Sequence, residues 1–291
     1  MKIKQVTLTT LKRSEQFRLS CPVKPELYAE LKTKLFGMPL IITNPQDEIV
    51  FGIDYYMFLK ETAATVTDVI ELELSHKEGL LLNYNMKDKF TGVNLYEKLL
   101  FVKKILPLAN REEIYGQTNL DITIDKELEK KLDRMLAEEF QAVLAAEQVT
   151  LKTALQLCNF DVEDRRVLLT LFATFPFTSS QQLRVLEMVE EVLFRDKCGI
   201  AEVFEKIHLA GFLETEKPQK AIIEALFRFR NPLYTETEAH WQTEIKKLAL
   251  PAHMQITHAP FFEKQQMELT IRLNTPEELK KFLTKITISP S

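Results

Sequence analysis

The hydrophobic and polar positions of the N-terminal third predict a mixed α/β region. Apolar runs at 40–42 and 49–51 flank the turn-forming sequence NPQD, so they are typical of two strands joined by a tight turn. Gly52 follows the second run, where strand gives way to helix, and Asp54 lies in the first turn of that helix. Further strands are predicted at 3–11 and 66–74, and helices at 25–36, 55–61, 94–106 and from Ser75 through Leu82.

The middle third has helical spacing throughout. Leu128, Leu132, Leu136 and Phe140 recur every four residues, which places them on one helical face. Another helix is predicted to begin at Thr150. Three more short helices are predicted at 162–172, 179–194 and 200–207.

The last third changes character. Helical spacing at 220–229 and 235–248 is followed by alternating segments at 254–256 and 267–273, and then by the helix-start sequence TPEE. We therefore expect an α+β protein with three domains. They are a mixed α/β domain at 1–106, an all-helical middle domain at 107–210, and a small α+β module of two antiparallel strands and two helices at 211–291.

Composition narrows the function classes. The chain has 291 residues, 45% hydrophobic and 27% charged, and its net charge of -4 argues against a protein that coats nucleic acid by bulk electrostatics. Its seven glycines form no GxG sequence, which excludes a P-loop and a dinucleotide-binding fingerprint. The sequence has neither a long apolar run nor a signal peptide, so we expect a cytoplasmic protein without a membrane partner.

Three passages resemble one known family. They are IVFGIDYYMFLKETA, which is a strand–glycine–helix element, LLNYNMKDKF followed by NLYEKLLFVKKIL, and FQAVLAAEQVTLKTALQLCNFDVEDRRVLLTLF. Together they resemble the ParB family, and more closely its divergent ParB-like proteins, over residues 40–203. The resemblance implies a ParB/sulfiredoxin-type N-terminal domain that binds CTP or ATP with magnesium, a helical domain that binds DNA, and a role in chromosome partitioning.

The resemblance also implies a set of nucleotide- or phosphate-binding residues. In the family a basic pair follows the glycine, whereas Ile53 and Asp54 follow it here. Each lost charge-assisted contact costs about 1.5–3 kcal/mol, and Asp54 would repel a phosphate. We therefore expect degenerate nucleotide binding, although the same positions also fit a helix cap, half-buried rings and a solvated helix end. The residues of this set are Gly52, Asp54, Tyr55, Asn85, Lys87, Lys89 and Glu97.

DNA contacts are expected from Lys98, Lys103 and Lys104, which lie along one amphipathic helix and fit a nonspecific phosphate track. The segment at 110–125, NREEIYGQTNLDITID, occupies the place expected for a helix-turn-helix but is acidic and poorly periodic. Sequence-specific readout uses a recognition helix rich in basic and amide side chains. This segment therefore argues against such readout.

No catalytic or metal-binding residue is predicted. His253 and His258 lie five residues apart without a third ligand nearby, and no serine or cysteine has the sequence context of a nucleophile. Trp241 and the pair Phe261 and Phe262 fit a core or an interface of the last module. The two phenylalanines also fit an exposed partner surface.

The sequence thus predicts a non-enzymatic, ParB-like, DNA- or chromosome-associated protein that acts through DNA and protein contacts as a homodimer. Two alternatives stay open. One is an active CTP- or ATP-dependent DNA-sliding clamp, an NTPase, which requires nucleotide-dependent self-association. The other is a nuclease or phosphotransferase on the same scaffold, and a nuclease requires metal-dependent cleavage.

Overall fold

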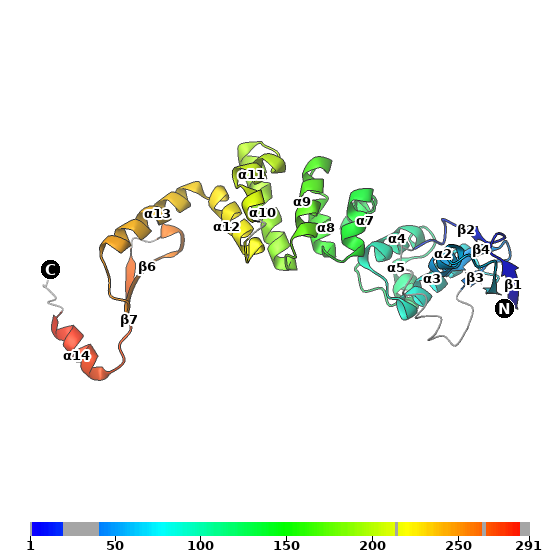
Figure 1. Ribbon diagram of the computed structural model, residues 1–291, viewed down its shortest axis with the longest axis horizontal. Helices are drawn as coiled ribbons and strands as arrows, with labels where there is room; N and C mark the ends of the chain where they lie inside the picture. Colours follow the sequence, from blue (N-terminus) through cyan, green and yellow to red (C-terminus); the bar gives the residue numbers. More distant parts are fainter. Residues whose placement is uncertain (1, 20–40, 213–214, 264–265, 286–291) are drawn as a thin grey trace. The chain divides into compact units, whose positions relative to one another are not determined.

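The computed structural model describes residues 2–19, 41–212, 215–263 and 266–285. The chain divides into two compact units, unit 1 at Met1–Gln219 and unit 2 at Lys220–Ser291, and each is described by itself. The helix predicted at 25–36 lies outside the described residues. The expected α+β fold class is confirmed, because a mixed sheet precedes a long series of helices in unit 1 (Figure 1).

Unit 1 begins with a five-stranded mixed sheet in the order β1-β5-β3-β4-β2. The predicted hairpin is confirmed: β3 and β4 are antiparallel, and Asn44 closes their turn by accepting hydrogen bonds at Oδ1 from the backbone of Gln46 and Glu48. The strand predicted at 3–11 ends at Thr7, where the chain turns. The strands are β1 Lys2–Thr7, β2 Lys12–Arg13, β3 Ile41–Thr43, β4 Glu48–Phe51 and β5 Val66–Glu71.

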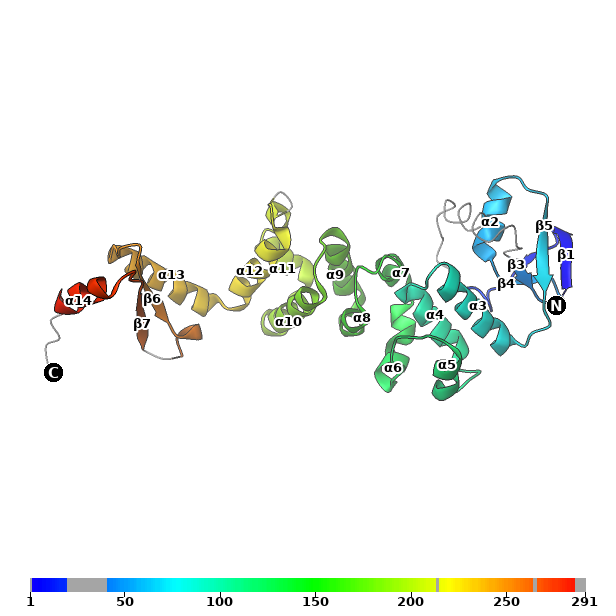
Figure 2. The same ribbon diagram turned by 90° about the horizontal axis from the view of Figure 1, so that it is seen from below.

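Helix α2, Ile53–Glu61, supplies the apolar partner of this sheet (Figure 2). Its Tyr55, Tyr56 and Leu59 pack against strand residues in one buried cluster. The helix begins two residues before the predicted start at 55. The full cluster contains Leu8, Leu11, Ile41, Ile49, Tyr55, Tyr56, Leu59 and Val69.

The rest of unit 1 is helical, as predicted. The capping box at Ser75 and Glu78 is confirmed at the start of α3, and Thr150 is the N-cap of α8. The four-residue repeat from Leu128 to Phe140 is split between two helices, because Ala137 is extended. The helices are α3 His76–Phe90, α4 Leu95–Ile105, α5 Arg111–Gln117, α6 Lys126–Met135, α7 Glu138–Ala145, α8 Leu151–Leu157, α9 Val162–Thr174, α10 Ser179–Asp196, α11 Ile200–Lys206 and the 3-10 helix η1 Leu209–Phe212.

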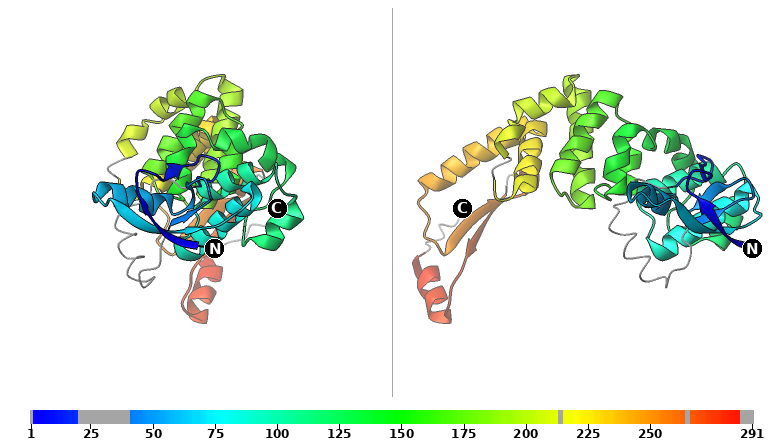
Figure 3. Two further views of the ribbon diagram at one scale, coloured as in Figure 1. Left: turned by 90° about the vertical axis from the view of Figure 1, so that its right-hand side faces the viewer. Right: turned by 45° about the vertical axis from the view of Figure 1, so that its right-hand side comes forward.

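Unit 2 contains helices and one antiparallel hairpin of β6 and β7 (Figure 3). Helix α13 starts at Pro232 rather than at 235, since proline is well accommodated at the first helical position. The elements are α12 Pro218–Arg230, which crosses the boundary between the units, α13 Pro232–Lys247, β6 Met254–His258, the 3-10 helix η2 Pro260–Phe262, β7 Met267–Ile271 and α14 Pro276–Lys285. No described helix is long and apolar enough to cross a membrane.

Candidate functional site

The strand–glycine–helix element has the backbone geometry that its sequence predicts. Gly52 is the N-cap of α2 and has φ 88° and ψ 23°. This left-handed conformation is strained for residues with a Cβ atom. The cap makes no side-chain hydrogen bond, and Asp54 is the acidic residue of the first turn. The glycine therefore allows β4 to pass directly into α2 and sets the position of Asp54.

A buried cluster of three charged side chains lies next to this turn. The Nζ atom of Lys87 on α3 lies 3.1 Å from Oε1 of Glu97 on α4 and 3.5 Å from Oδ2 of Asp54. The side chains of Lys87, Glu97 and Asp54 are 5%, 3% and 15% exposed. One ammonium group thus joins the starts of α2 and α4.

Glu97 is held in this cluster by the start of its own helix. Asn94 Oδ1 accepts the backbone N–H of Glu97 at 3.0 Å, and Glu97 Oε2 accepts the backbone N–H of Asn94 at 3.2 Å. This is a capping box. One carboxylate oxygen closes the cap while the other faces Lys87. The spacing Asn-x-x-Glu is the sequence signature of this cap, whereas the family resemblance predicts Glu97 as a nucleotide-binding residue.

The charge balance of the cluster decides what it can bind. Two carboxylates surround one ammonium group, and all three side chains are largely removed from water. A buried charge is tolerated only when it is paired. The charge of Lys87 is therefore already balanced within the protein, and a triphosphate approaching this turn would meet carboxylates.

The remaining members of the predicted nucleotide set lie apart. The ring of Tyr55 is buried in the core beneath the sheet and stacks on Phe58. Asn85 is exposed and donates from Nδ2 to the backbone carbonyl of Gln117 at 2.9 Å. Lys89 is exposed near the end of α3. Of the predicted nucleotide-binding residues, Gly52 thus lies beside the cluster of Asp54, Lys87 and Glu97. Tyr55, Asn85 and Lys89 lie outside this cluster.

The three lysines predicted to contact DNA have two different kinds of partner. Lys98 Nζ lies 2.7 Å from Asp121, and Lys103 Nζ lies 2.7 Å from Asp133. Lys104 donates instead to the backbone carbonyls of Glu15 and Arg18. Burial lowers the pKa of Lys104. The three side chains are therefore not equivalent members of one track.

A pocket of about 630 Å³ lies beside α4. Its lining combines charged side chains with apolar ones. Its two lysines are predicted from the sequence as DNA contacts, but its arginine is not, because Arg18 is distant from α4 in the sequence. The lining residues are Glu15, Arg18, Tyr96, Leu100, Lys103, Lys104, Leu136 and Gln141.

The segment at 110–125 forms α5 and a connection to α6. A helix-turn-helix joins its helices by three or four residues, whereas 118–125 separate these two. The first turn of α6 is acidic, with Glu127 paired to Lys131 and Glu129 paired to Arg111. Lys126 is the single basic residue of this turn, whereas a recognition helix begins with several basic and amide side chains.

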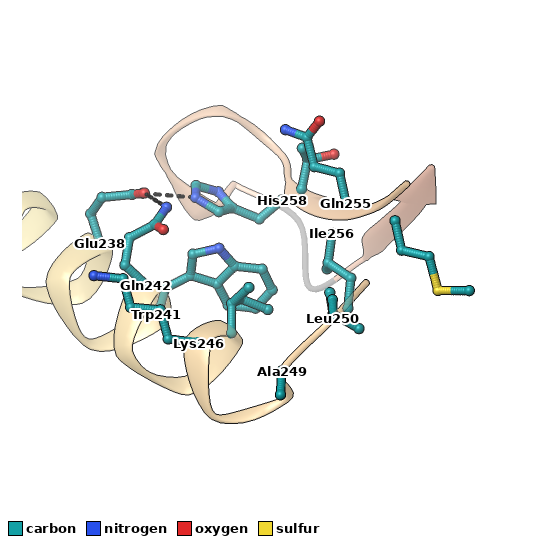
Figure 4. A pocket seen from close by; sticks show the side chains of 12 residues that line it. Glu238, Trp241, Gln242, Lys246, Ala249, Leu250, Gln255, Ile256 and His258 are labelled. Atoms are coloured by element: carbon teal, nitrogen blue, oxygen red, sulfur yellow. Dashed lines mark hydrogen bonds and ion pairs between the residues drawn. The ribbon is translucent and has the colours of Figure 1, made fainter. Parts of the chain in front are cut away.

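A second pocket, of about 520 Å³, lies between α13 and β6 in unit 2 (Figure 4). Glu238 accepts hydrogen bonds from Nε2 of His258 at 2.7 Å and from Gln242 at 2.8 Å. Hydrogen bonds from Gln242 and His258 hold the pKa of Glu238 below its ordinary value. The His258 ring stacks on Phe262 at 3.7 Å and meets Trp241 edge-on at 5.2 Å. Sequence offered no signal for this pairing across β6 and α13.

Metal-binding and nucleophilic groups are sparse in the part of the chain that the structure describes. Within it, no three histidine, cysteine, aspartate or glutamate side chains are grouped to hold a metal ion. Cys158 is buried, and burial raises the pKa of its thiol, which makes it a poor nucleophile.

No protein-family model matches the chain, and no curated protein does. One solved structure that resembles it is a C-terminally truncated chromosome-partitioning protein ParB from Caulobacter crescentus complexed with CTP-gamma-S. The sequence identity is 16%, the match covers 60% of this chain and 99% of that chain, and the TM-score is 0.27. The same protein complexed to the centromeric parS site has 14% identity, coverage of 63% and 98%, and a TM-score of 0.36. A Pnob8-like ParB-N domain has 14% identity, coverage of 81% and 96%, and a TM-score of 0.41. These TM-scores are too low for similarity to assign a function.

Proposed function

We propose that the chain is a ParB-like, DNA-associated protein that acts through DNA and protein contacts, and that its nucleotide site is degenerate. The observation that carries this proposal is the buried cluster of Asp54, Lys87 and Glu97. The resemblance of the strand–glycine–helix element to the ParB family implies a phosphate site at this place. In this chain an internal ion-pair cluster lies there instead.

The energetics favour the internal cluster over a nucleotide. A triphosphate would have to separate Lys87 from two carboxylates that are already within 3.5 Å. Breaking a buried ion pair costs about 3–5 kcal/mol. The basic pair that would offset this cost is absent after Gly52. Millimolar CTP or ATP, with or without magnesium, is therefore expected to leave the fold unchanged.

We also propose that the protein is a homodimer and that unit 2 supplies the contact. Exposed apolar side chains in unit 2 support this assignment, since monomeric proteins rarely expose many together. A two-stranded hairpin is at best marginally stable by itself, and β7 exposes most of its residues. The exposed large apolar residues are Leu233, Leu248, Phe261, Met267, Leu269, Leu279 and Leu283.

The test combines two measurements on the full chain. Fluorescence anisotropy with a labelled duplex is expected to show DNA binding that weakens steeply with salt, because the contacts are to phosphates. Thermal denaturation with each of CTP, ATP, GTP and UTP is expected to show no shift. A nucleotide at about 100 times its Kd would stabilise the fold by about 2.7 kcal/mol, so binding would be visible.

Three outcomes contradict the proposal. A magnesium-dependent shift with one nucleotide would establish the sliding-clamp alternative, and magnesium-dependent cleavage of the duplex would establish the nuclease alternative. Absence of DNA binding at low salt would remove the DNA-associated role. Asp54→Asn, compared with the exposed control Asp68→Asn, tests whether the acid at the turn is what excludes the nucleotide.

A further inference from the structure

The pocket beside α4 differs in charge from every other site described above. Three of its lining side chains are cations and one is a carboxylate, Glu15. The Asp54 cluster has the opposite balance, with two carboxylates and one cation. An excess of positive charge in a concave site attracts anions. The cations are Arg18, Lys103 and Lys104.

Lys104 fixes the geometry of this pocket. Its ammonium group donates to the carbonyls of Glu15 and Arg18, so it ties the turn that carries Arg18 to α4. An ammonium group has three N–H donors, and no described carboxylate forms an ion pair with this one. Its charge is thus half-buried and only partly compensated.

The other two cations are paired in a way that a ligand can replace. Arg18 lies 3.2 Å from Glu15, and Lys103 lies 2.7 Å from Asp133. All four of these side chains are substantially exposed. Exposed ion pairs contribute about 0–1 kcal/mol, so an incoming phosphate can take the place of either carboxylate at little cost.

We propose that this pocket binds a backbone phosphate of DNA, with Arg18 and Lys103 as its direct contacts and Lys104 as the residue that positions the turn. The proposal rests on the DNA association proposed above and names the site that carries it. Leu100 and Leu136 form an apolar part of the lining, which suits the sugar next to a phosphate. Lys98 does not line the pocket.

The test measures the affinity for a DNA duplex of two groups of variants: one group removes a cation of the pocket, and the other removes a carboxylate that pairs with such a cation. Arg18→Gln and Lys103→Gln each remove one phosphate contact and are expected to weaken binding about tenfold. Each should also reduce the slope of log affinity against log salt by about one. Glu15→Gln and Asp133→Asn release those cations and are expected to strengthen binding by up to about fivefold.

Two controls separate a defined pocket from general surface charge. Lys130→Gln removes an exposed lysine of α6, and Asp121→Asn releases Lys98 outside the pocket. Both are expected to change the affinity less than twofold. If the controls match the pocket variants while wild type binds DNA, the pocket assignment is overturned and the DNA role stands. If wild type binds no DNA, the proposed function itself fails.

Discussion

Unit 1 and unit 2 differ most in how they bury apolar side chains. Unit 1 has a continuous set of fully buried residues, which includes Leu80, Phe101 and Phe140. In unit 2, no residue that the structure describes after Leu226 is buried. Unit 1 is therefore stabilised by its own core, whereas unit 2 presents its apolar residues outward. This difference supports the proposal that unit 2 supplies the contact of a homodimer.

One ionic cluster from each unit shows a similar difference in burial. The cluster of Asp54, Lys87 and Glu97 is almost completely buried, so its members cannot separate without a large cost. The pair of Glu238 and His258 is partly exposed at the edge of a pocket. The cluster of Asp54, Lys87 and Glu97 thus reinforces the core of unit 1, whereas Glu238 of the unit 2 pair remains more accessible to solvent.

The largest expected difference in stability comes from replacing one phenylalanine in each unit by alanine. Phe140 is 0% exposed and Phe261 is 56% exposed. Phe140→Ala is expected to lower the free energy of unfolding by about 3–5 kcal/mol, because a buried ring leaves a cavity. Phe261→Ala is expected to cost less than about 1 kcal/mol. Urea denaturation followed by circular dichroism measures both, and equal losses would remove the distinction between the units.

Breaking the buried ion cluster is expected to be nearly as costly. Lys87→Met leaves Asp54 and Glu97 facing each other without a cation, at a cost of about 3 kcal/mol. Lys89→Met, two residues away on the exposed face of α3, is the matched control and is expected to change stability by less than about 0.5 kcal/mol. The same urea titration applies. Equal stability of the two variants would show that the cluster is not what holds α2, α3 and α4 together.

Much of the fold of unit 1 was predictable because its signals are local. The turn at Asn44, the left-handed Gly52, and the caps at Ser75 and Thr150 depend on residues within a few positions of each other. The break at Ala137 was not predicted, because the four-residue apolar repeat continues across it.

For the candidate sites, the sequence predicts which residues are of interest but not which side chains they contact. The family resemblance places Asp54, Lys87 and Glu97 among seven predicted nucleotide-binding residues. It does not predict that these three form ion pairs where α2, α3 and α4 meet. The carbonyl partners of Lys104 lie more than eighty positions away in the sequence. Periodicity and motifs contain no information about such distant pairs.

The next largest effect is expected at the proposed dimer contact of unit 2, which would use its exposed apolar side chains. Leu269 on β7 is 51% exposed, and Phe194 on α10 in unit 1 is 87% exposed. Leu269→Lys is expected to weaken self-association more than about tenfold by placing a charge in the interface. Phe194→Lys, although more exposed, is expected to have no effect. Sedimentation velocity over a range of concentrations measures both. Dissociation by Phe194→Lys alone would move the interface to unit 1.

The smallest expected effect is a pH response confined to unit 2. Hydrogen bonds from Gln242 and His258 hold the pKa of Glu238 below its ordinary value of 4.5. The unfolded chain therefore takes up this proton first as pH falls. The stabilisation is fully present above 4.5 and is lost as pH falls through the lowered pKa of the folded state. Glu238→Gln should remove this dependence.

Trp241 makes this response measurable in unit 2 alone, because it is the single tryptophan of the chain and meets His258 edge-on. Thermal unfolding followed by its fluorescence is expected to shift to lower temperature with acid in wild type, and to shift less in Glu238→Gln. Glu236→Gln, an exposed neighbour on α13, should behave as wild type. If Glu236→Gln reduced the pH dependence as much as Glu238→Gln does, the response would be due to the overall charge of α13. The pair of Glu238 and His258 would then no longer distinguish unit 2 from unit 1.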